Sequence, residues 1–217
     1  MEETNAWERA YERFETPREE IRKFEKRLAH VGAGTWPRSA RIVEIFCGRG
    51  NGLHALTSLG FRNVEGADLS PRLLAKYEGP ARCHVCDCRA LPFEDASRDV
   101  VIVQGGLHHL ERLPDDLHTT LDEARRVLSA RGRLVVIEPW HTPFLRLVHA
   151  VTARATARRL SAKLDAFEEM YVHERETYER WLASGPAILR ALEQRFHPQR
   201  SEIAWGKLVF VGEPRAR

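Results

Sequence analysis

The chain has no long apolar runs of the kind found in membrane proteins. No segment approaches the about 18 consecutive apolar residues that a membrane-spanning helix needs, and residues 1–20 are mostly charged or polar rather than an export signal. Cysteine is also scarce, with Cys47, Cys83, Cys86 and Cys88 as the complete set. We therefore expect no membrane partner and a cytoplasmic location in which these thiols stay reduced.

An excess of charge of one sign is missing too. The chain has 34 Lys and Arg against 31 Asp and Glu, a formal net charge of +3, and its basic residues are scattered. A nucleic-acid-binding surface should appear as a basic patch or stripe, so we expect no nucleic-acid partner. With 217 residues, 43% of them hydrophobic, and no internal repeat, the sequence predicts a single globular domain over residues 1–217.

The most informative stretch is Arg41–Gly52. An apolar run, 42–46, is typical of a strand buried on both faces, and it is followed by Gly48, Gly50 and Gly52. Apolar residues then recur at helical spacing, at Leu53, Leu56 and Leu59. A strand, a glycine turn and a helix form the opening unit of a nucleotide-binding α/β fold, in which glycines let a ligand approach the backbone.

Strand and helix patterns alternate along the first two thirds of the chain. After helices in 1–36, we predict strands at 41–46, 63–68, 81–87, 99–103 and 132–138, with helices at 53–59, 72–77 and 114–128 between them. The N-terminal helices carry an aromatic stripe of Trp7, Tyr11 and Phe14. Residues 141–197 show helical patterns alone, and 198–213 read as an antiparallel hairpin turning at 205–206. The predicted fold class is α/β: a Rossmann-like doubly wound sheet, mostly parallel, with a C-terminal hairpin and helical cap segments on a cofactor-binding core at 40–140.

Carboxylates and other polar residues gather where the predicted strands end. Ligands of such sheets bind outside the carboxyl ends of the strands, which favours a nucleotide site here. The glycine pattern departs from the dinucleotide fingerprint because Leu53 replaces its last glycine, and no Gly-Lys-Ser/Thr of a P-loop follows. Glu44, before the glycines, would repel a pyrophosphate but suits a ligand with a cationic amino group and a sulfonium.

Several segments, in the right order, resemble the class I S-adenosylmethionine-dependent methyltransferases, in their small-molecule (type 11-like) branch. The similarity covers about residues 40–140 and the terminal hairpin. Val43–Gly50 resembles the first motif of that family and Gly66–Pro71 the second. Cys86–Phe93, Asp99–Leu110 and Gly132–Pro139 are similar to the segments around its third, fourth and fifth strands.

This resemblance implies S-adenosylmethionine as the cofactor and a set of residues that hold it. Gly48 and Gly50 would pass under the methionine part, Glu44 would support it, and Gln104 would lie near the transferred methyl group. Asp68 would bind the ribose hydroxyls, Leu69 would pack on adenine, and Asp87 and the Cys88 backbone would bind its edge. Phe46 stands where the family usually has its first glycine, so its ring is expected to crowd the methionine side or to pack beneath it.

The expected activity is methyl transfer to an O, N or C atom of a small-molecule acceptor, in secondary or specialised metabolism. Candidate general bases are His108, His109 and His141, with Glu138 as a possible orienting partner; each histidine has a structural role as its alternative. The helical block at 141–197 is expected to shape the acceptor pocket, with a homodimer face as the alternative. A non-catalytic cofactor-binding module remains a second class of function. A nucleic-acid methyltransferase is disfavoured because Gln104-Gly-Gly-Leu107 follows the fourth strand.

The three closely spaced cysteines raise the question of a metal site. If 83–88 is a strand, Cys86 and Cys88 face one side and Cys83 faces the other, so the three thiols do not converge. We therefore predict no metal site from them. An enzyme that methylates a metalloid and uses cysteines chemically remains the lesser alternative.

Overall fold

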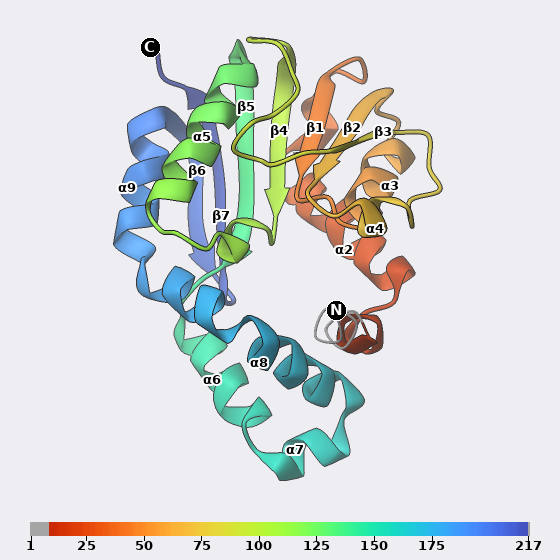
Figure 1. Cartoon of the computed structure of the whole chain (residues 1–217), viewed down its shortest axis with the longest axis vertical. Coiled ribbons are helices and arrows are strands. Elements are labelled where there is room, and N and C mark those ends of the chain that lie inside the picture. Colours follow the sequence, from red (N-terminus) through yellow and green to blue (C-terminus); the bar gives the residue numbers. More distant parts are fainter. Residues whose placement is uncertain (1–8, 217) are drawn as a thin grey trace.

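The computed structural model describes residues 9–216 and is built on one seven-stranded sheet (Figure 1). Its strands are β1 (Arg41–Ile45), β2 (Asn63–Asp68), β3 (Arg82–Val85), β4 (Arg98–Gln104), β5 (Leu128–Pro139), β6 (Phe196–Ala204) and β7 (Lys207–Pro214). They lie in the order β3-β2-β1-β4-β5-β7-β6. The first five pair in parallel, and β7 runs antiparallel to both β5 and β6. The predicted fold class is confirmed.

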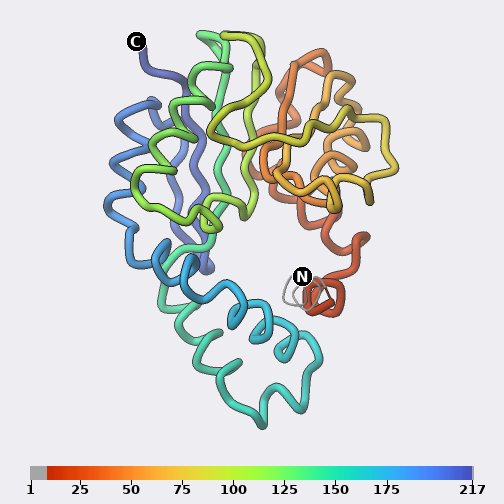
Figure 2. Tube along the Cα trace, viewed as in Figure 1, coloured from red at the N-terminus to blue at the C-terminus, as the bar shows by residue number. Residues whose placement is uncertain are grey.

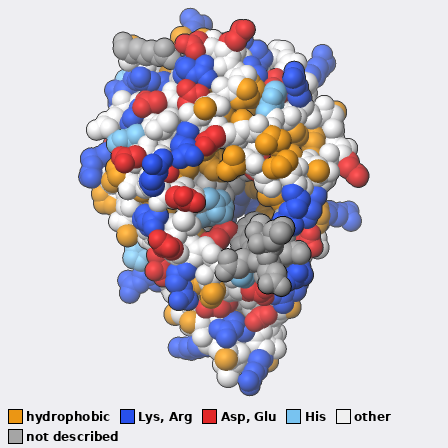
Figure 3. All heavy atoms as spheres, in the orientation of Figure 1, with side chains coloured by type: hydrophobic (Ala, Val, Ile, Leu, Met, Phe, Trp, Pro, Cys, Tyr) orange, Lys and Arg blue, Asp and Glu red, His pale blue; other side chains and the backbone are white. Residues whose placement is uncertain are grey.

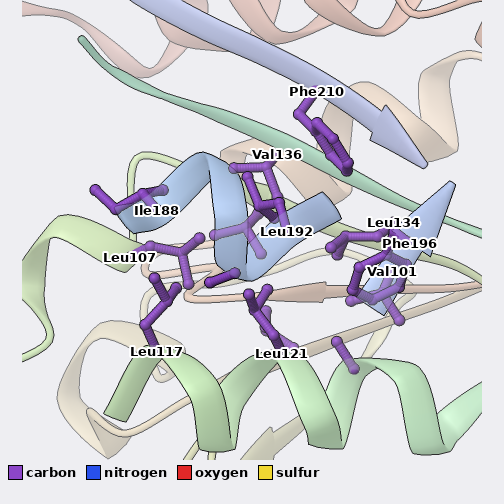
Figure 4. Packing of buried hydrophobic residues seen from close by; sticks show 14 of the residues in the cluster. Val101, Leu107, Leu117, Leu121, Leu134, Val136, Ile188, Leu192, Phe196 and Phe210 are labelled. Carbon is purple, nitrogen blue, oxygen red and sulfur yellow. The ribbon is translucent and has the colours of Figure 1, made fainter. Parts of the chain in front are cut away.

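Helices cover both faces of this sheet. Helices α2 (Pro17–His30) and α3 (Asn51–Ser58) pack on one face, while α5 (Asp115–Val127) and α9 (Gly185–Arg195) pack on the other. The sequence of strand β4 is continuously apolar because its alternate residues are buried in the hydrophobic cores on the two opposite faces of the sheet. Figure 4 shows the second core, where sheet residues meet α5 and α9: Val101, Leu134, Val136 and Phe210 face Leu117, Leu121, Ile188 and Leu192.

Three helices extend beyond the sheet: α6 (Pro143–Thr152), α7 (Ala155–Leu160) and α8 (Ala162–Ala183) (Figure 2). Ion pairs join the start of α8 to the N-terminal segment, with 2.8 Å from Lys163 to Glu19 and 3.4 Å from Arg13 to Asp165. At the other end of α8, the indole N–H of Trp181 donates to the Pro139 carbonyl at 2.8 Å. The helix is thus held at both ends. No helix within residues 9–216 has the length and apolar character needed to span a bilayer.

The local signals behave largely as predicted at the N-terminus. Thr16 caps α2, and the reciprocal bond from Glu19 completes the capping box. Residues 9–14 are helical and carry Tyr11 and Phe14, whereas Trp7 lies outside the described residues. The remaining short elements are η1 (Ala33–Thr35), α4 (Pro71–Leu74) and η2 (Leu107–His109).

Some predicted boundaries are wrong. The third strand ends at Val85 rather than at Asp87, because the Asp87 carboxylate accepts from the Arg89 backbone N–H and starts a turn. The helix predicted at 72–77 is only the single turn α4. The fifth strand begins at Leu128, four residues early, because Leu128 already pairs with Arg98 on β4.

The terminal hairpin is confirmed, and its strands are longer than predicted. Its turn residues Trp205 and Gly206 both have positive φ, 50° and 76°. That conformation matches the right-handed twist of the flanking strands. The hairpin places β7 beside β5 and completes the sheet.

Candidate active site

A cavity of about 1290 Å³ lies at the carboxyl ends of the parallel strands. Residues that end β1, β2, β4 and β5 line one side of it, and residues from α6, α8 and the N-terminal segment line the other. Figure 3 shows this face of the molecule hollowed, with histidine and acidic side chains around the hollow. Strands β2 and β3 lie on one side of β1, and β4 and β5 lie on the other. The strand order therefore reverses at β1, and the cavity lies at this topological switch point of the sheet.

The glycine turn after β1 forms the floor of this cavity. Gly48 and Gly50 have positive φ, 53° and 78°, which glycine adopts without strain. The backbone N–H of Gly48 donates to Asp68 at 2.8 Å, which fixes the turn against the end of β2. Phe46 also has a positive φ, 58°, and its ring lies against Gly106. The residue at the family's glycine position therefore keeps the backbone conformation of a glycine.

Glu44 is the buried acid of the site. Its side chain is only 3% exposed, and one carboxylate oxygen accepts from the Gln104 amide at 3.1 Å. Within the described residues, its Oε2 and the Gln104 Oε1 have no hydrogen-bond partner. A Cβ on Gly52 would come within 2.0 Å of Oε2, so glycine there makes room for the carboxylate. Burial raises the pKa of Glu44 to about 8.

Asp68 and Leu69 stand at the end of β2. Both Asp68 oxygens accept backbone N–H groups at 2.8 Å, one from Gly48 and one from Ser70. The carboxylate therefore orders the turn and still has lone pairs toward the cavity. Leu69 is 71% exposed although it lines the cavity. An apolar side chain exposed in this position is a natural contact for a flat ligand ring.

Asp87 and Cys88 line the same side of the cavity, but their side chains already have partners. Arg89 donates to both Asp87 oxygens and reaches Asp116 at 2.8 Å with its other guanidinium nitrogen. These hydrogen bonds from Arg89 hold the pKa of Asp87 below its usual value. The Cys88 thiol lies 3.4 Å from the Thr120 hydroxyl. For Asp87 to accept from a ligand amine as predicted, one of its oxygens would have to accept from Arg89 and from the ligand at the same time.

Three of the four cysteines, Cys47, Cys86 and Cys88, have a raised thiol pKa, whereas the contact with Cys47 lowers the pKa of Cys83. Contact with the Cys83 thiol, together with burial, raises the pKa of Cys47. Burial also raises the pKa of Cys86, and it raises that of Cys88 to about 11. Thiols with raised pKa carry little thiolate, the nucleophilic form. This disfavours the use of Cys86 or Cys88 in metalloid chemistry.

His108 and His109 enter the cavity from η2. The backbone N–H groups of Gly106 and Leu107 donate to Glu138 at 2.7 and 2.8 Å, and the other Glu138 oxygen lies 2.8 Å from His108 Nδ1. Burial disfavours the His108 cation, but the hydrogen bonds with Glu138 and the Glu174 charge outweigh it and raise its pKa to about 9. Burial and the neighbouring His108 cation lower the pKa of His109.

The three candidate histidines are not brought together. His141 is exposed, and it is absent from the lining of the cavity. It lies between the end of β5 and the start of α6. The rule that residues after parallel strands face the ligand predicted His141 at the site, but the chain has already turned away from the cavity at this position.

Sequence reasoning missed two acidic residues that contact the site from far along the chain. Glu174 on α8 lies 3.7 Å from His108 and 3.6 Å from His109. Glu20 on α2 is buried and binds Arg49 at 3.1 Å and the Asn51 amide, both in the glycine turn. The sequence offered one signal for Glu20: it stands four residues before Phe24, on the face of the helix predicted to be buried. No signal pointed to Glu174, because the helix that carries it mixes polar and apolar residues on all faces.

The comparisons with known sequences agree with this geometry. Residues 43–136 match a family model described as a methyltransferase domain. Over 150 residues the chain is 29% identical to the demethylmenaquinone methyltransferase of Clavibacter sepedonicus, covering 65% of this chain and 59% of that protein. Over 54 residues it is 46% identical to a ubiquinone/menaquinone biosynthesis C-methyltransferase of Dinoroseobacter shibae, covering 25% and 20%. The chain thus spans less than two thirds of these curated relatives.

Solved structures share the whole fold. The PH0226 protein of Pyrococcus horikoshii superposes with a TM-score of 0.66 at 19% identity, covering 89% of this chain and 91% of that one. A geranyl diphosphate C-methyltransferase of Streptomyces coelicolor gives 0.60 at 16%, covering 91% and 81%. Residues 43–136 thus match a methyltransferase domain, and the fold around them is shared with S-adenosylmethionine-dependent methyltransferases.

The residues of the cavity fit the cofactor of this family, S-adenosylmethionine. The unpartnered oxygens of Glu44 and Gln104 suit the cationic amino group of its methionine part, which needs acceptors in a buried place. Gly48 and Gly50 leave the backbone bare beneath a ligand, and exposed Leu69 offers a surface for adenine. When bound, S-adenosylmethionine supplies a methyl group activated by its positively charged sulfur.

Proposed function

We propose that this methyltransferase transfers the methyl group to an O, N or C atom of a small, largely apolar acceptor. The observation that carries the proposal is the size and lining of the cavity. At about 1290 Å³ it exceeds the roughly 300–1,000 Å³ of a pocket for one ligand, and so leaves room for an acceptor beside the cofactor. Its cofactor end is built from the glycine turn, Glu44 and Gln104.

The acceptor end is apolar and aromatic. Helices α6 and α8 present side chains to the cavity on the side opposite the sheet, and these are Phe144, Val148, Phe167, Met170, Tyr171 and Tyr178. Polar groups that reach this end from the described residues include His108, His109 and Glu174. Such a pocket favours a ring-bearing or prenyl-like body that carries one polar group. The helical block therefore acts as a cap that shapes acceptor choice.

The protein's task is to align the acceptor with the methyl group and to exclude water, because the leaving group is already activated. His108, paired with Glu138, is the cationic member of the histidine pair near pH 7, and it donates rather than accepts a proton. His109 is neutral there and can accept a proton from an acceptor that arrives protonated. Glu138 is a positioning residue that orients His108.

Names of relatives supply the first acceptors to test. They include a demethylmenaquinone methyltransferase, a geranyl diphosphate methyltransferase and a 1,6-didemethyltoxoflavin methyltransferase. These differ in chemistry but share an apolar or ring-shaped body. A role in secondary or specialised metabolism belongs to this proposal. The alternative of a binding module without turnover predicts cofactor binding and no product with any acceptor.

The test begins with cofactor binding by calorimetry. We expect saturable binding of S-adenosylhomocysteine, and roughly tenfold or greater loss of affinity in Glu44→Gln, because a charge-assisted hydrogen bond contributes about 1.5–3 kcal/mol. Glu202→Gln, on the surface strand β6, is the matched control and should bind normally. Turnover is then measured over a panel of quinols, prenyl diphosphates and nitrogen heterocycles. Absence of cofactor binding by the wild-type protein would refute the proposal.

A further inference from the structure

Three side chains of ligand type converge on the acceptor end of the cavity. His108 and His109 come from η2, and Glu174 comes from α8, far along the chain. One nitrogen from each histidine and one oxygen from the carboxylate all lie within 4.8 Å of one another. The two imidazole rings lie against each other, with centroids 4.2 Å apart and planes tilted by 35°.

The spacing is too wide for direct hydrogen bonds. His108 Nε2 lies 3.7 Å from a Glu174 oxygen, and His109 Nδ1 lies 3.6 Å from the other. N–H···O bonds are normally about 2.7–3.2 Å. Two ligands that each lie about 2.1 Å from a tetrahedral zinc ion are separated by roughly 3.4 Å. The two histidine–carboxylate distances are slightly longer than this separation, so a small inward movement of the side chains would place the three ligand atoms around one ion.

The inner histidine is also oriented as a metal ligand is. Glu138 is fully buried, is fixed by the Gly106 and Leu107 N–H groups, and holds Nδ1 of His108 at 2.8 Å. That bond directs Nε2 of His108 toward Glu174. A carboxylate behind a ligating imidazole is the usual second-sphere arrangement of protein metal sites.

We propose that His108, His109 and Glu174 bind a first-row divalent cation, with Zn²⁺ as the representative ion. Two imidazoles and one carboxylate suit Zn²⁺ or its neighbours, whereas Mg²⁺ prefers oxygen ligands. All three residues line the cavity, so the bound ion would be open to an oxygen of the acceptor. The role of the ion rests on the proposed function: it would displace the proton of His108, hold both histidines as neutral ligands in place of His109 acting as a base, and lower the pKa of a bound acceptor hydroxyl or enolisable carbonyl.

Zinc binding is tested on the full chain after removal of metals with a chelator. We expect calorimetry and metal analysis after dialysis to give one Zn²⁺ per chain, and Mg²⁺ in excess not to displace it. Loss of a ligand in Glu174→Gln or His109→Gln should weaken binding by at least about 100-fold, the upper end of the effect of second-sphere changes. Co²⁺ in place of Zn²⁺ should give the visible absorption of a tetrahedral site in the wild type and not in these variants.

Two controls separate this site from others. His173→Gln removes a neighbouring α8 histidine outside the group, and Cys83→Ser/Cys86→Ser removes competing thiols; both should bind Zn²⁺ as the wild type does. Undiminished binding in Glu174→Gln and His109→Gln, loss in the cysteine variant, or no stoichiometric binding in the wild type would overturn the proposal. S-adenosylhomocysteine binding, measured on every variant, reports folding. If the wild-type protein binds S-adenosylhomocysteine but not Zn²⁺, only the metal site is refuted. If it does not bind S-adenosylhomocysteine, the proposed function is refuted.

Discussion

Phe46 shows how a single residue can depart from its family without losing the local structure. A left-handed conformation costs a non-glycine residue roughly 1–2 kcal/mol, and Phe46 adopts it at φ 58°. Its ring then occupies the space beside Gly106, where an added Cβ would lie 2.3 Å from the ring. The glycine that the first motif lacks is thus matched by a glycine in the fourth.

We therefore expect Phe46 and Gly106 to be energetically coupled. Gly106 has φ −124°, open to any residue, so Gly106→Ala should destabilise the protein only through its clash with Phe46, by about 1–3 kcal/mol. In the Phe46→Gly background, which also removes the clashing Cβ, the same change should be nearly neutral. Urea unfolding of all four proteins gives the coupling energy.

Gly34→Ala is the control for this pair, because an added Cβ there meets nothing within 4 Å. It should change stability by less than about 0.5 kcal/mol. Equal penalties for Gly106→Ala with and without Phe46 would show that the ring is not the obstacle.

At the scale of the element, α8 is the part of the cap that reaches the chemistry. It is a helix of 22 residues that buries only Ala166 and Trp181 fully, so its own packing holds it weakly. Its position depends on its ends, through Lys163 with Glu19 and Trp181 with the Pro139 carbonyl. Because Pro139 ends β5, the indole ties the cap directly to the sheet.

Trp181 allows the hydrogen bond to be separated from packing. Trp181→Phe should cost about 1–2 kcal/mol of stability, because the Pro139 carbonyl loses its donor while most of the volume stays filled. Trp181→Ala should cost about 3–5 kcal/mol, because it also opens a cavity beside Trp140. Chemical denaturation measures both. Leu160→Ala, at an 88% exposed site, should be nearly neutral, and a similarly small effect of Trp181→Ala would contradict the anchoring role.

At the scale of the whole molecule, stability and ligand binding meet at Glu44. The sheet buries this carboxylate between two cores, where its charge has no cationic partner within hydrogen-bond distance among the described residues. Ionising a buried carboxyl group without a partner lowers stability, so Glu44 keeps its proton to an unusually high pH unless a ligand cation compensates its charge. Above that pKa the protein without ligand should therefore be less stable than the protein with it.

The pH dependence of stability follows from the raised pKa of about 8. Between its unfolded value near 4.5 and 8, Glu44 keeps its proton only in the folded state, so its contribution to stability declines as pH rises through this window. Glu44→Gln has no such decline. Relative to the wild type it should gain on the order of a few kcal/mol between pH 4.5 and pH 8, since each pKa unit corresponds to about 1.4 kcal/mol.

Urea unfolding of both proteins at pH 4.5, 6 and 8 measures this difference. All other titrating groups are common to the two proteins and cancel. Glu94→Gln, at an exposed loop position, serves as the control for pH and should show no such difference. A stability difference between wild type and Glu44→Gln that stays constant or shrinks toward pH 8 would contradict the assignment.

The sequence by itself determined the parallel core and the cofactor end of the cavity. Apolar runs, glycine spacing and acids at strand ends are local signals. Parallel strands bring their carboxyl ends to one edge of the sheet even when the exact ends of the strands are not known. Glu44, Gly48, Gly50, Asp68 and Gln104 were placed by this rule alone. Turn chemistry was less readable: β3 ends early where the Asp87 side chain accepts from the Arg89 N–H, and after Leu74 the chain leaves α4 through i→i−3 turns at Lys76 and Tyr77.

Only the tertiary structure decided the acceptor end. Whether His108 faces Glu138 depends on how η2 packs against the end of β5, and whether His141 reaches the cavity depends on how the chain leaves β5. Whether Glu174 approaches both neighbouring histidines depends on where α8 lies beyond the sheet. The position of α8 is set by contacts between residues far apart in the chain, such as Trp181 with Pro139 and Lys163 with Glu19. Periodicity reports which face of a helix is apolar, but it carries no information about which distant segment that helix will meet.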